Sequence, residues 1–282
     1  MSTMGASNPI SKQSIVNTHF AASSRYWRDV YTAESVPATI YRERRDLVLR
    51  WIDALGTPCD SSALDVGCGA GFFAVALAER GYRVQAVDTV DSMLQQTADV
   101  VRQRGLQDLI MVSHGDAHQL QYTGNSFDLV IAIGVTPWLH SLNRGLSELV
   151  RVTKPGGHLI LTADNRLRLS YWFDPRFFPL IYHLRRKAAN FLRRLGWWSH
   201  PHAHGYSIKA FDQALTAAGL HTLCGQTIGF GPFTFFERNL FSDDFGVELH
   251  TYLHRLQPRL RILGQLGSQY VVLAQKPLNS SL

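Results

Sequence analysis

Apolar positions repeat at two different spacings, and the two alternate along the middle of the chain. Short apolar runs, typical of buried strands, are each followed by about ten residues with apolar positions three and four apart, typical of helices. The predicted strands are Ala63–Val66, Arg83–Val87, Leu109–Ser113, Phe127–Ile133 and His158–Ala163. The predicted helices are Phe72–Arg80, Ser92–Arg104 and Asn143–Thr153. Strands that alternate with helices predict a parallel sheet with helices packed on both faces.

The two ends of the chain extend this pattern. Helical spacing of apolar residues covers 14–31 and 40–55, and a Gly-Thr-Pro sequence ends the second stretch. Near the C-terminus, a helix is predicted over Ile208–Ala218 and strands over His221–Ile228 and Tyr270–Gln275. The expected fold is therefore a Rossmann-like α/β fold with a seven-stranded, mostly parallel sheet.

Two long segments, roughly 164–207 and 231–268, interrupt the alternation. Loops of this length are usually functional or carry structure of their own. Both follow predicted strands at their C-terminal ends, where open α/β sheets bind ligands, so both are expected to cap the site. The expected organisation is a disordered tail (1–13), N-terminal helices (14–58), a core (59–163), a basic aromatic cap (164–206), a core helix and strand (207–230), a second cap (231–268) and a last strand with its tail (269–282).

Composition places the chain among globular proteins. Hydrophobic residues make up 45% of the 282 residues and charged residues 18%, which excludes an intrinsically disordered protein. No window reaches the roughly 20 apolar residues of a membrane-spanning helix, and the first dozen residues lack a secretory signal pattern. Three cysteines at unrelated spacings form neither a disulfide framework nor a zinc site. We therefore expect a cytoplasmic protein with reduced thiols.

The net charge of +6 comes from one segment. Residues 176–209 hold seven basic residues and no acidic one, and the rest of the chain is close to neutral. A nucleic-acid binder usually spreads basic charge more widely. A predicted helix over 183–198 has three interpretations: a solvated basic face, peripheral contact with an anionic membrane surface, or arginines that hold an anionic group of a substrate.

A glycine-rich loop, DVGCGAG over 65–71, lies between the first core strand and the helix that follows it. Glycines there permit positive φ and let a ligand touch the main chain. The spacing is GxGxG rather than the GxGxxG of dinucleotide sites. The acid two residues before the first glycine, Asp65, would repel a pyrophosphate and stabilise an ammonium or sulfonium group.

Further landmarks follow the next strands. Asp88 closes the second strand, where a carboxylate can accept both hydroxyls of a ribose, and Asp116 follows the third, where a carboxylate can accept an exocyclic amine. FDLV over 127–130 and KPGGH over 154–158 complete the set. In this order and spacing, the chain resembles the class I S-adenosylmethionine-dependent methyltransferases. It is most similar to the small-molecule enzymes that include the ubiquinone and menaquinone biosynthesis methyltransferases, over about 61–163.

The resemblance implies that S-adenosylmethionine is the cofactor, that S-adenosylhomocysteine is the product, and that 59–163 binds both. It places the methionine moiety on the glycine loop, the ribose on Asp88, the adenine amine on Asp116, and the adenine face on Met93. The alternative roles are a helix cap for Asp88, a turn residue for Asp116 and a plain core position for Met93. The implied cofactor-binding residues are Asp65, Gly67, Cys68, Gly69, Asp88, Thr89, Met93, Asp116, Ala117, Ile133 and Gly134.

The residues after the fourth strand argue against a nucleic-acid substrate. The sequence GVTPW over 134–138 departs from the [Asp/Asn/Ser]-Pro-Pro-aromatic tetrad of enzymes that methylate nucleic-acid amines, and it holds no Pro-Cys. We expect no nucleic-acid partner. An RNA or protein methyltransferase, whose binding to polyanions would depend on salt, is the alternative.

Two residues are candidate catalytic groups. His140 lies just past the fourth strand, where similar enzymes often place a histidine, and imidazole is the usual general base near neutral pH. Tyr26 belongs to an N-terminal stretch that resembles a lid helix over the cofactor. The alternative role of His140 is to cap the following helix, and that of Tyr26 is packing. The candidate substrate-binding residues are His19, Trp138, Tyr206 and Phe233.

No metal is expected, because HPHAH over 200–204 has no acid or cysteine nearby. The aromatic stretch over 229–236 favours a large apolar or amphipathic acceptor. The sequence thus predicts a cytoplasmic methyltransferase of small-molecule biosynthesis that methylates oxygen, or else carbon, of such an acceptor by base-assisted direct displacement. A non-catalytic S-adenosylmethionine-binding protein at a membrane surface is a further alternative.

Overall fold

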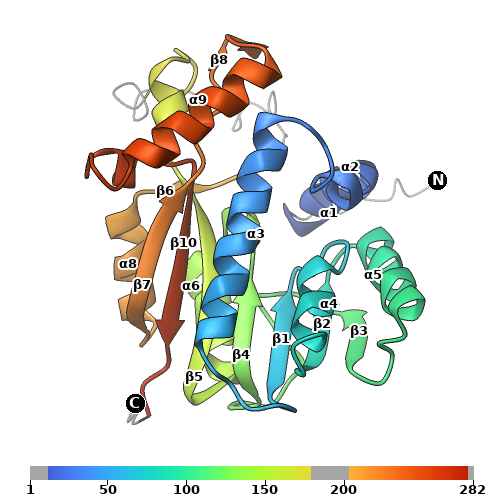
Figure 1. Cartoon of the computed structure of the whole chain (residues 1–282). Helices are drawn as coiled ribbons and strands as arrows, with labels where there is room; N and C mark the ends of the chain where they lie inside the picture. Colours follow the sequence, from blue (N-terminus) through green and yellow to red (C-terminus); the bar gives the residue numbers. More distant parts are fainter. Residues whose placement is uncertain (1–11, 179–202, 279–282) are drawn as a thin grey trace, which may run out of the picture.

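The computed structural model describes residues 12–178 and 203–278, and shows a central sheet between two layers of helices (Figure 1). The strands of the main sheet are β1 (Ser62–Val66), β2 (Arg83–Asp88), β3 (Ile110–His114), β4 (Phe127–Ala132), β5 (Thr153–Asn165), β6 (Gly205–Tyr206), β7 (His221–Ile228) and β10 (Gln269–Gln275). The α-helices are α1 (Lys12–Ala22), α2 (Ser24–Asp29), α3 (Val36–Ala54), α4 (Phe72–Ala78), α5 (Asp91–Arg104), α6 (Leu142–Val152), α8 (Ile208–Ala217) and α9 (Asp243–Leu256).

Seven strands of the main sheet follow the order β3-β2-β1-β4-β5-β10-β7, and the two-residue strand β6 pairs with β5. Strand β10 is antiparallel to both of its neighbours, and the other pairs are parallel. The chain moves outward from β1 to β3 on one side and then returns to β4 on the other. The order therefore reverses between β1 and β4, which is where open α/β sheets bind ligands. The predicted Rossmann-like fold is confirmed.

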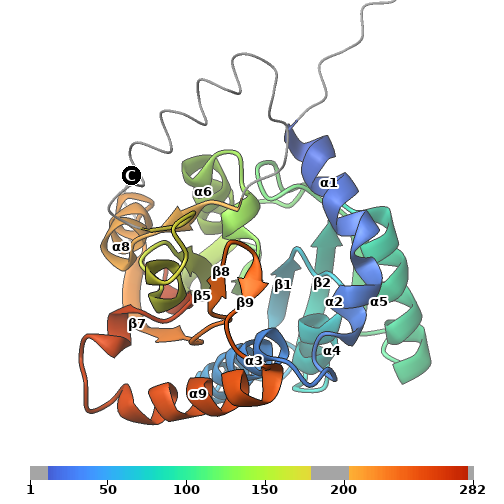
Figure 2. The same ribbon diagram turned by 90° about the horizontal axis from the view of Figure 1, so that it is seen from above.

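Both faces of the sheet are buried, which explains the continuous apolar runs of its strands. Successive strand residues point to opposite faces, so Ala63 joins the core under α3, α4 and α5, whereas Leu64 joins the core under α6 and α8. Viewed from above, these two groups of helices lie on opposite sides of the sheet (Figure 2). The loops at the strand ends are thereby held between two packed layers.

The N-terminal helices differ from the predicted pattern at their ends. The stretch over 14–31 divides into α1 and α2 at Ser23, whose φ of −104° and ψ of 12° depart from helical values. Helix α3 begins four residues earlier than predicted. Ser35 caps it by accepting from the Ala38 backbone N–H at 3.3 Å, and Pro37 lies in its first turn.

The two segments that interrupt the alternation leave the sheet at one edge. Strands β5 and β7 run in the same direction because each is antiparallel to β10 between them. After β5 the chain forms the 3-10 helix η2 (Leu169–Trp172), and after β7 it forms the hairpin β8 (Thr234–Phe235) and β9 (Arg238–Asn239), then α9 and the 3-10 helix η4 (Leu263–Gln265). All of them lie at the top of Figure 1. The predicted basic helix over 183–198 lies outside the described residues, as do His200 and His202.

Helix α9 was not predicted as a helix. Its start carries a recognisable signal: the Ser242 hydroxyl accepts from the Phe245 backbone N–H, and Asp243 and Asp244 occupy the first turn. No helix in the described ranges is both long enough and apolar enough to cross a membrane.

Candidate active site

A cavity of about 640 Å³ opens at the C-terminal ends of β1, β2 and β4. This volume lies in the range of small-molecule sites. One side is formed by the loops that follow the strands, and the other by α1, α2 and α3. All eleven residues that the resemblance implies for the cofactor line this cavity, together with Trp138. Residues from four separate loops are thus brought to one place.

The glycine loop after β1 is fixed by the backbone of β2. The N–H groups of Gly67 and Cys68 both donate to the carbonyl oxygen of Val87, at 2.7 and 3.0 Å. Gly67 has a φ of 69°, and a Cβ at this position would meet Val135 Cγ2 at 2.4 Å. Gly69 also has a positive φ, of 56°, and a Cβ there would meet nothing closer than 4.0 Å. The first glycine is required by packing, and the second leaves the main chain open to a ligand.

Asp65 lies at the end of β1, buried beneath this loop. Its Oδ2 has no hydrogen-bond partner among the described residues. Burial, followed by the negative charge of Asp88, raises the pKa of Asp65 to about 7. An unpaired carboxylate oxygen in a cavity wall is unfavourable unless a donor or a cation occupies the cavity. Asp65 therefore fits the ammonium group of an amino-acid moiety.

Asp88 uses its carboxylate to shape the loops around it. Oδ2 accepts from the Gly69 N–H and Oδ1 from the Val90 N–H, both at 3.0 Å. Burial raises the pKa of this carboxyl, although these backbone hydrogen bonds oppose the shift. A carboxylate oxygen can accept more than one hydrogen bond, so both oxygens keep a free acceptor position. Asp88 thus supports the start of α5 and still fits a pair of ribose hydroxyls.

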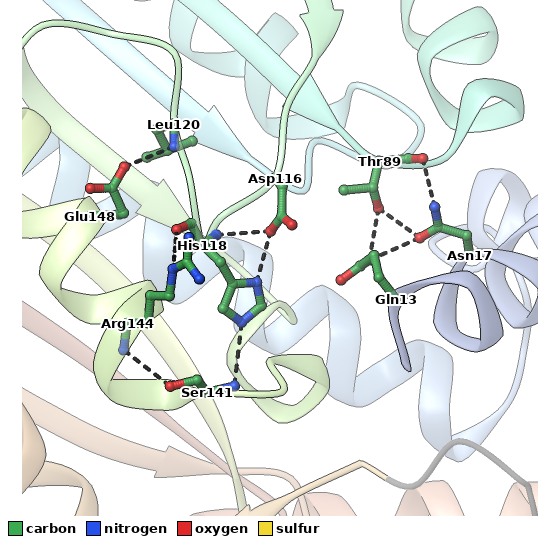
Figure 3. A network of polar contacts seen from close by, with 9 residues as sticks. All are labelled: Gln13, Asn17, Thr89, Asp116, His118, Leu120, Ser141, Arg144 and Glu148. Atoms are coloured by element: carbon green, nitrogen blue, oxygen red, sulfur yellow. Dashed lines mark hydrogen bonds and ion pairs between the residues drawn. The ribbon is translucent and has the colours of Figure 1, made fainter. Parts of the chain in front are cut away.

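Asp116, after β3, is held by a histidine (Figure 3). Its Oδ1 accepts from the backbone N–H of His118 at 2.8 Å and contacts Nδ1 of the same residue at 2.7 Å. The buried His118 receives a third contact, from the Ser141 N–H to Nε2 at 3.4 Å. Nε2 is then the acceptor, so Nδ1 carries the proton and donates to Asp116. Burial raises the pKa of Asp116, but the hydrogen bonds from His118 outweigh it and lower the pKa overall.

His140 does not line the cavity. Its exposed ring stacks on His118, with the centroids 3.5 Å apart and the planes at 24°. Burial, followed by the charge of His118, lowers the pKa of His140. The structure therefore places His140 behind the Asp116–His118 pair rather than against a bound acceptor. Its assignment as general base stays a prediction. The sequence offers His118, two residues after Asp116, as a second candidate base but favours a structural role for it; its contact with Asp116 was not predicted.

Helix α1 crosses the cofactor side of the cavity and is joined to the loop after β2 by polar side chains (Figure 3). Asn17 donates from Nδ2 to the Thr89 carbonyl at 3.0 Å and accepts from the Thr89 hydroxyl at 2.9 Å. Gln13 donates to the same hydroxyl at 3.2 Å. Helix α1 has no fully buried residue, so these polar contacts and the packing of Phe20 on Trp27 and Trp138 hold it in place. Neither polar residue was predicted from the sequence, although the two occupy one helix face four positions apart.

The other predicted N-terminal contacts lie one layer from the cavity. His19 is exposed and stacks on Trp138, with ring centroids 5.3 Å apart. Tyr26 is also exposed and packs edge-on against Trp27, with centroids 5.2 Å apart. Trp138 and Trp27 themselves line the cavity. Burial raises the pKa of Tyr26, although the charge of Arg44 opposes the shift.

The two substrate-binding residues expected from the caps do not line the cavity. Tyr206 packs against Phe211 in the core, with ring centroids 5.7 Å apart. Phe233 is buried between Phe173 and Phe241, at 5.2 and 6.1 Å. Their roles in substrate binding stay predictions.

A group of polar residues that was not predicted from the sequence lines the same cavity. It consists of Tyr41, Arg44, Asp164, Arg168 and Gln269. These residues are far apart in the chain and have no common motif. They are brought together by the packing of α3 against β10, which lies beside β5 in the sheet.

Comparisons with known proteins agree with this geometry. Residues 64–161 match the sequence model of a family described as a methyltransferase domain. Over 100 residues, the chain is 37% identical to the malonyl-[acyl-carrier protein] O-methyltransferase of Serratia marcescens, which covers 36% of this chain and 37% of that protein. It is 36% identical over 136 residues to the demethylmenaquinone methyltransferase of Geobacillus kaustophilus, covering 45% and 57%.

The magnesium protoporphyrin IX methyltransferase of Synechocystis PCC 6803, solved with bound SAH, is similar over 94% of this chain and all of that one. The TM-score is 0.63 and the identity 15%, a likeness that shows the fold. The resemblance to S-adenosylmethionine-dependent methyltransferases, including those of quinone biosynthesis, is thereby confirmed. The matched part of the chain spans 37% of the length of the Serratia marcescens protein and 57% of the length of the Geobacillus kaustophilus protein.

Proposed function

We propose, on the premise that residues 64–161 form a methyltransferase domain, that the whole chain is an S-adenosylmethionine-dependent methyltransferase of a small molecule. The single observation that carries the proposal is the buried, unpaired Oδ2 of Asp65 beneath the glycine loop. A negative group at this point disfavours a pyrophosphate and favours the ammonium of a methionine moiety. A dinucleotide-dependent enzyme would instead need this loop free of buried negative charge.

The residues around the cavity fit the cofactor from end to end. Asp65 would hold the ammonium group, Asp88 the two ribose hydroxyls and Asp116 the exocyclic amine of adenine. Met93, which is 2% exposed, would contribute an apolar surface for the adenine ring. When bound, S-adenosylmethionine supplies a sulfonium methyl group that an acceptor atom displaces in line.

The chain itself contributes binding, orientation and exclusion of water. Alignment of two reactants in a closed site contributes as much as about 7–11 kcal/mol to a displacement. The Asn17–Thr89 contacts hold α1 across the cavity, which restricts water on the cofactor side. The rings of Phe20, Trp27 and Trp138 line the same cavity and favour an apolar or amphipathic acceptor.

Oxygen remains the proposed acceptor atom. A hydroxyl acceptor needs a base, and the proposed base, His140, would have to act from outside the residues that line the cavity. An acceptor oxygen that is already anionic needs no base. The latter case suits a cavity with no histidine among its described lining residues.

The first experiment is a calorimetric titration of the purified protein with S-adenosylhomocysteine. The expected result is one-site binding that is lost in Asp88→Asn. Asp99→Asn is the matched control, because Asp99 lies on the α5 surface with Arg102 and does not line the cavity. Binding of NAD(H) in place of S-adenosylhomocysteine would refute the proposal.

The second experiment separates an enzyme from a binding protein. The protein is incubated with methyl-labelled S-adenosylmethionine and a set of phenolic, prenylated and lipid-like acids and alcohols. Label should appear in a small-molecule product. Label in RNA or protein would favour the alternative function, and tight cofactor binding without any transfer would favour a cofactor-binding protein without activity.

A further inference from the structure

The exposed apolar side chains of the protein are concentrated on the two segments that interrupt the α/β alternation, 164–207 and 231–268, which are named here the two insertions. The insertions are the smaller part of the described chain, yet they hold twelve of its sixteen exposed large apolar side chains. A scattered exposed apolar residue is ordinary, whereas a concentration of them at one end of a molecule marks an interaction site. Both insertions lie at the top of Figure 1. The twelve residues are Leu167, Trp172, Phe173, Phe177, Phe235, Phe236, Leu240, Phe241, Phe245, Tyr252, Leu260 and Ile262.

Polar contacts join the two insertions into one surface. The fully buried carboxylate of Asp174, which follows η2, accepts from the Thr234 hydroxyl in the β8–β9 hairpin at 2.8 Å. The same carboxylate accepts from Nη2 of Arg176 at 2.8 Å, and Arg176 also pairs with Glu237 in the hairpin turn. The exposed side chains around these contacts are therefore held in place before any partner binds, which lowers the entropic cost of binding.

The hairpin presents two phenylalanines at its tip. Phe235 of β8 pairs with Arg238 of β9, so Phe236 and Glu237 are the two central residues of the turn, with φ of 47° and 71°. This left-handed conformation favours glycine and asparagine, and a bulky residue there is an outlier. The Phe235 and Phe236 rings pack edge-on with centroids 4.9 Å apart, and they are 48% and 57% exposed. A strained position that holds an exposed ring points to a function for that ring.

The positive charge of the protein belongs to the same two insertions. Over the whole sequence, the insertions hold twelve basic and six acidic residues and the rest holds sixteen of each, so the insertions account for the entire net charge of +6. Exposed arginines of the second insertion whose side chains have no partner among the described residues are Arg238, Arg255, Arg259 and Arg261. The last three lie at the end of α9 and beyond it, roughly 20 Å from the acidic first turn of that helix. The exposed Leu260 and Ile262 alternate with these arginines.

Exposed aromatic rings beside unpaired arginines fit the surface of an anionic bilayer. Aromatic side chains are stabilised at the level of the lipid headgroups, and arginines are attracted to negatively charged lipids. A protein partner would instead anchor its side chains in pockets, but the cavity that this surface shows, between Phe233 and Phe241, has a volume of only about 10 Å³. A fluid bilayer adapts to protruding side chains and needs no pocket.

We propose that the two insertions bind the surface of an anionic lipid membrane, with the hairpin tip among the headgroups and the arginines beyond α9 on lipid phosphates. This surface is separate from the predicted basic helix over 183–198, which lies outside the described residues. Binding to a bilayer requires no methyl transfer, so it is independent of the proposed function. Arg168, which lines the cavity, lies over the Tyr171 ring at 4.6 Å, and Tyr171 is followed by the exposed Trp172, so the cavity and the membrane-binding surface are neighbours.

The test is co-sedimentation of the full chain with phosphatidylcholine vesicles that contain or lack phosphatidylglycerol. Wild type should bind the anionic vesicles about tenfold or more tightly than the neutral ones, and added salt should weaken the difference. Arg259→Gln combined with Arg261→Gln should weaken binding to anionic vesicles about thirtyfold. Phe235→Ser combined with Phe236→Asn should weaken it about tenfold. Asparagine suits the positive φ of position 236, so the turn should be kept.

Matched controls remove the same kinds of side chain outside the insertions. Arg83→Gln combined with Arg102→Gln removes two exposed arginines from β2 and α5, and Met111→Asn removes an exposed apolar side chain from β3. None of the three lines the cavity. Vesicle binding of both controls should stay close to that of wild type, and thermal melting of every variant establishes that it is folded.

The inference is overturned if wild type does not prefer anionic vesicles, or if either combined variant of the insertions binds them as wild type does. Polyglutamate and a single-stranded RNA serve as soluble polyanions. If they bind as tightly as the vesicles and the phenylalanine substitutions have no effect, the surface is a site for an acidic macromolecule and not for a bilayer. Because vesicle binding is measured without S-adenosylmethionine, a failure of the proposed function would leave this result unchanged.

Discussion

The contact between α1 and the cofactor loop allows a sharp prediction. Asn17→Ala removes two hydrogen bonds that join the helix to Thr89, at 3.0 and 2.9 Å. Each such bond contributes a net ~0.5–1.5 kcal/mol, so the docked position of α1 should lose about 1–3 kcal/mol. If α1 covers the bound cofactor, the affinity for S-adenosylhomocysteine should fall about fivefold to 150-fold.

The same substitution should hardly change the melting temperature of the ligand-free protein, because α1 contributes no buried residue to the core. Calorimetry gives the affinity, and hydrogen exchange of α1 amides with and without ligand reports its docking. Thr18→Ala is the matched control, since the Thr18 hydroxyl bonds only within its own helix, to the Ser14 carbonyl at 2.9 Å. Equal affinity of Asn17→Ala and wild type, or a large drop in melting temperature, would refute the reasoning.

Three further predictions concern other positions. Gly67→Ala should abolish S-adenosylhomocysteine binding in calorimetry, because the new Cβ would lie 2.4 Å from Val135 Cγ2. Gly105→Ala is the control: Gly105 has a φ of 67° but open space around it, so this variant should only lower the free energy of unfolding by about 1–2 kcal/mol in a denaturant melt. His118→Phe should weaken S-adenosylhomocysteine binding about tenfold in calorimetry, because it removes the ring N–H that holds the carboxylate of Asp116 in position. The contact with Glu43 raises the pKa of His254, so the stabilising effect of this pair is full at low pH and is lost as the pH rises through the raised pKa. The melting temperatures of wild type and His254→Gln should therefore differ in acid and converge at alkaline pH. A difference that grows with pH would contradict this.

Much of the sheet and of the cofactor side could be predicted because its signals are local. Each strand of the core is a short apolar run, and the candidate cofactor residues stand at or just after strand ends, as Asp88 does at the end of β2. A loop that follows a parallel strand is placed by that strand, so the sequence offset already determines the position in space. The role of His140 stays a prediction, because its position outside the cavity lining depends on the packing of its loop against His118 and not on an offset from a strand end.

Residues that meet only through packing between distant elements left no such signal. In the sequence, Arg44 is one of several basic residues in its helix, and it is buried because α3 packs against β7 and β10. Helix α9 carries a start signal at Ser242, but its apolar face is completed by contacts with α3 rather than by its own periodicity. Local patterns therefore predict the strands and the motifs that follow them, and leave open what packs over them.

The arrangement of the cavity changes where acceptor selection is expected to reside. The two insertions were expected to cover the site and to define the acceptor. In the described residues, no position of 231–268 lines the cavity, and the first insertion contributes Asp164 and Arg168 near its beginning. Many of the other lining residues come from α1, α2 and α3, including Trp27, Tyr41 and Arg44. The candidate cofactor residues follow the strands, whereas these residues stand on helices that precede the sheet, so we expect substitutions in α1, α2 and α3 to change the choice of acceptor without altering the loops proposed to bind the cofactor.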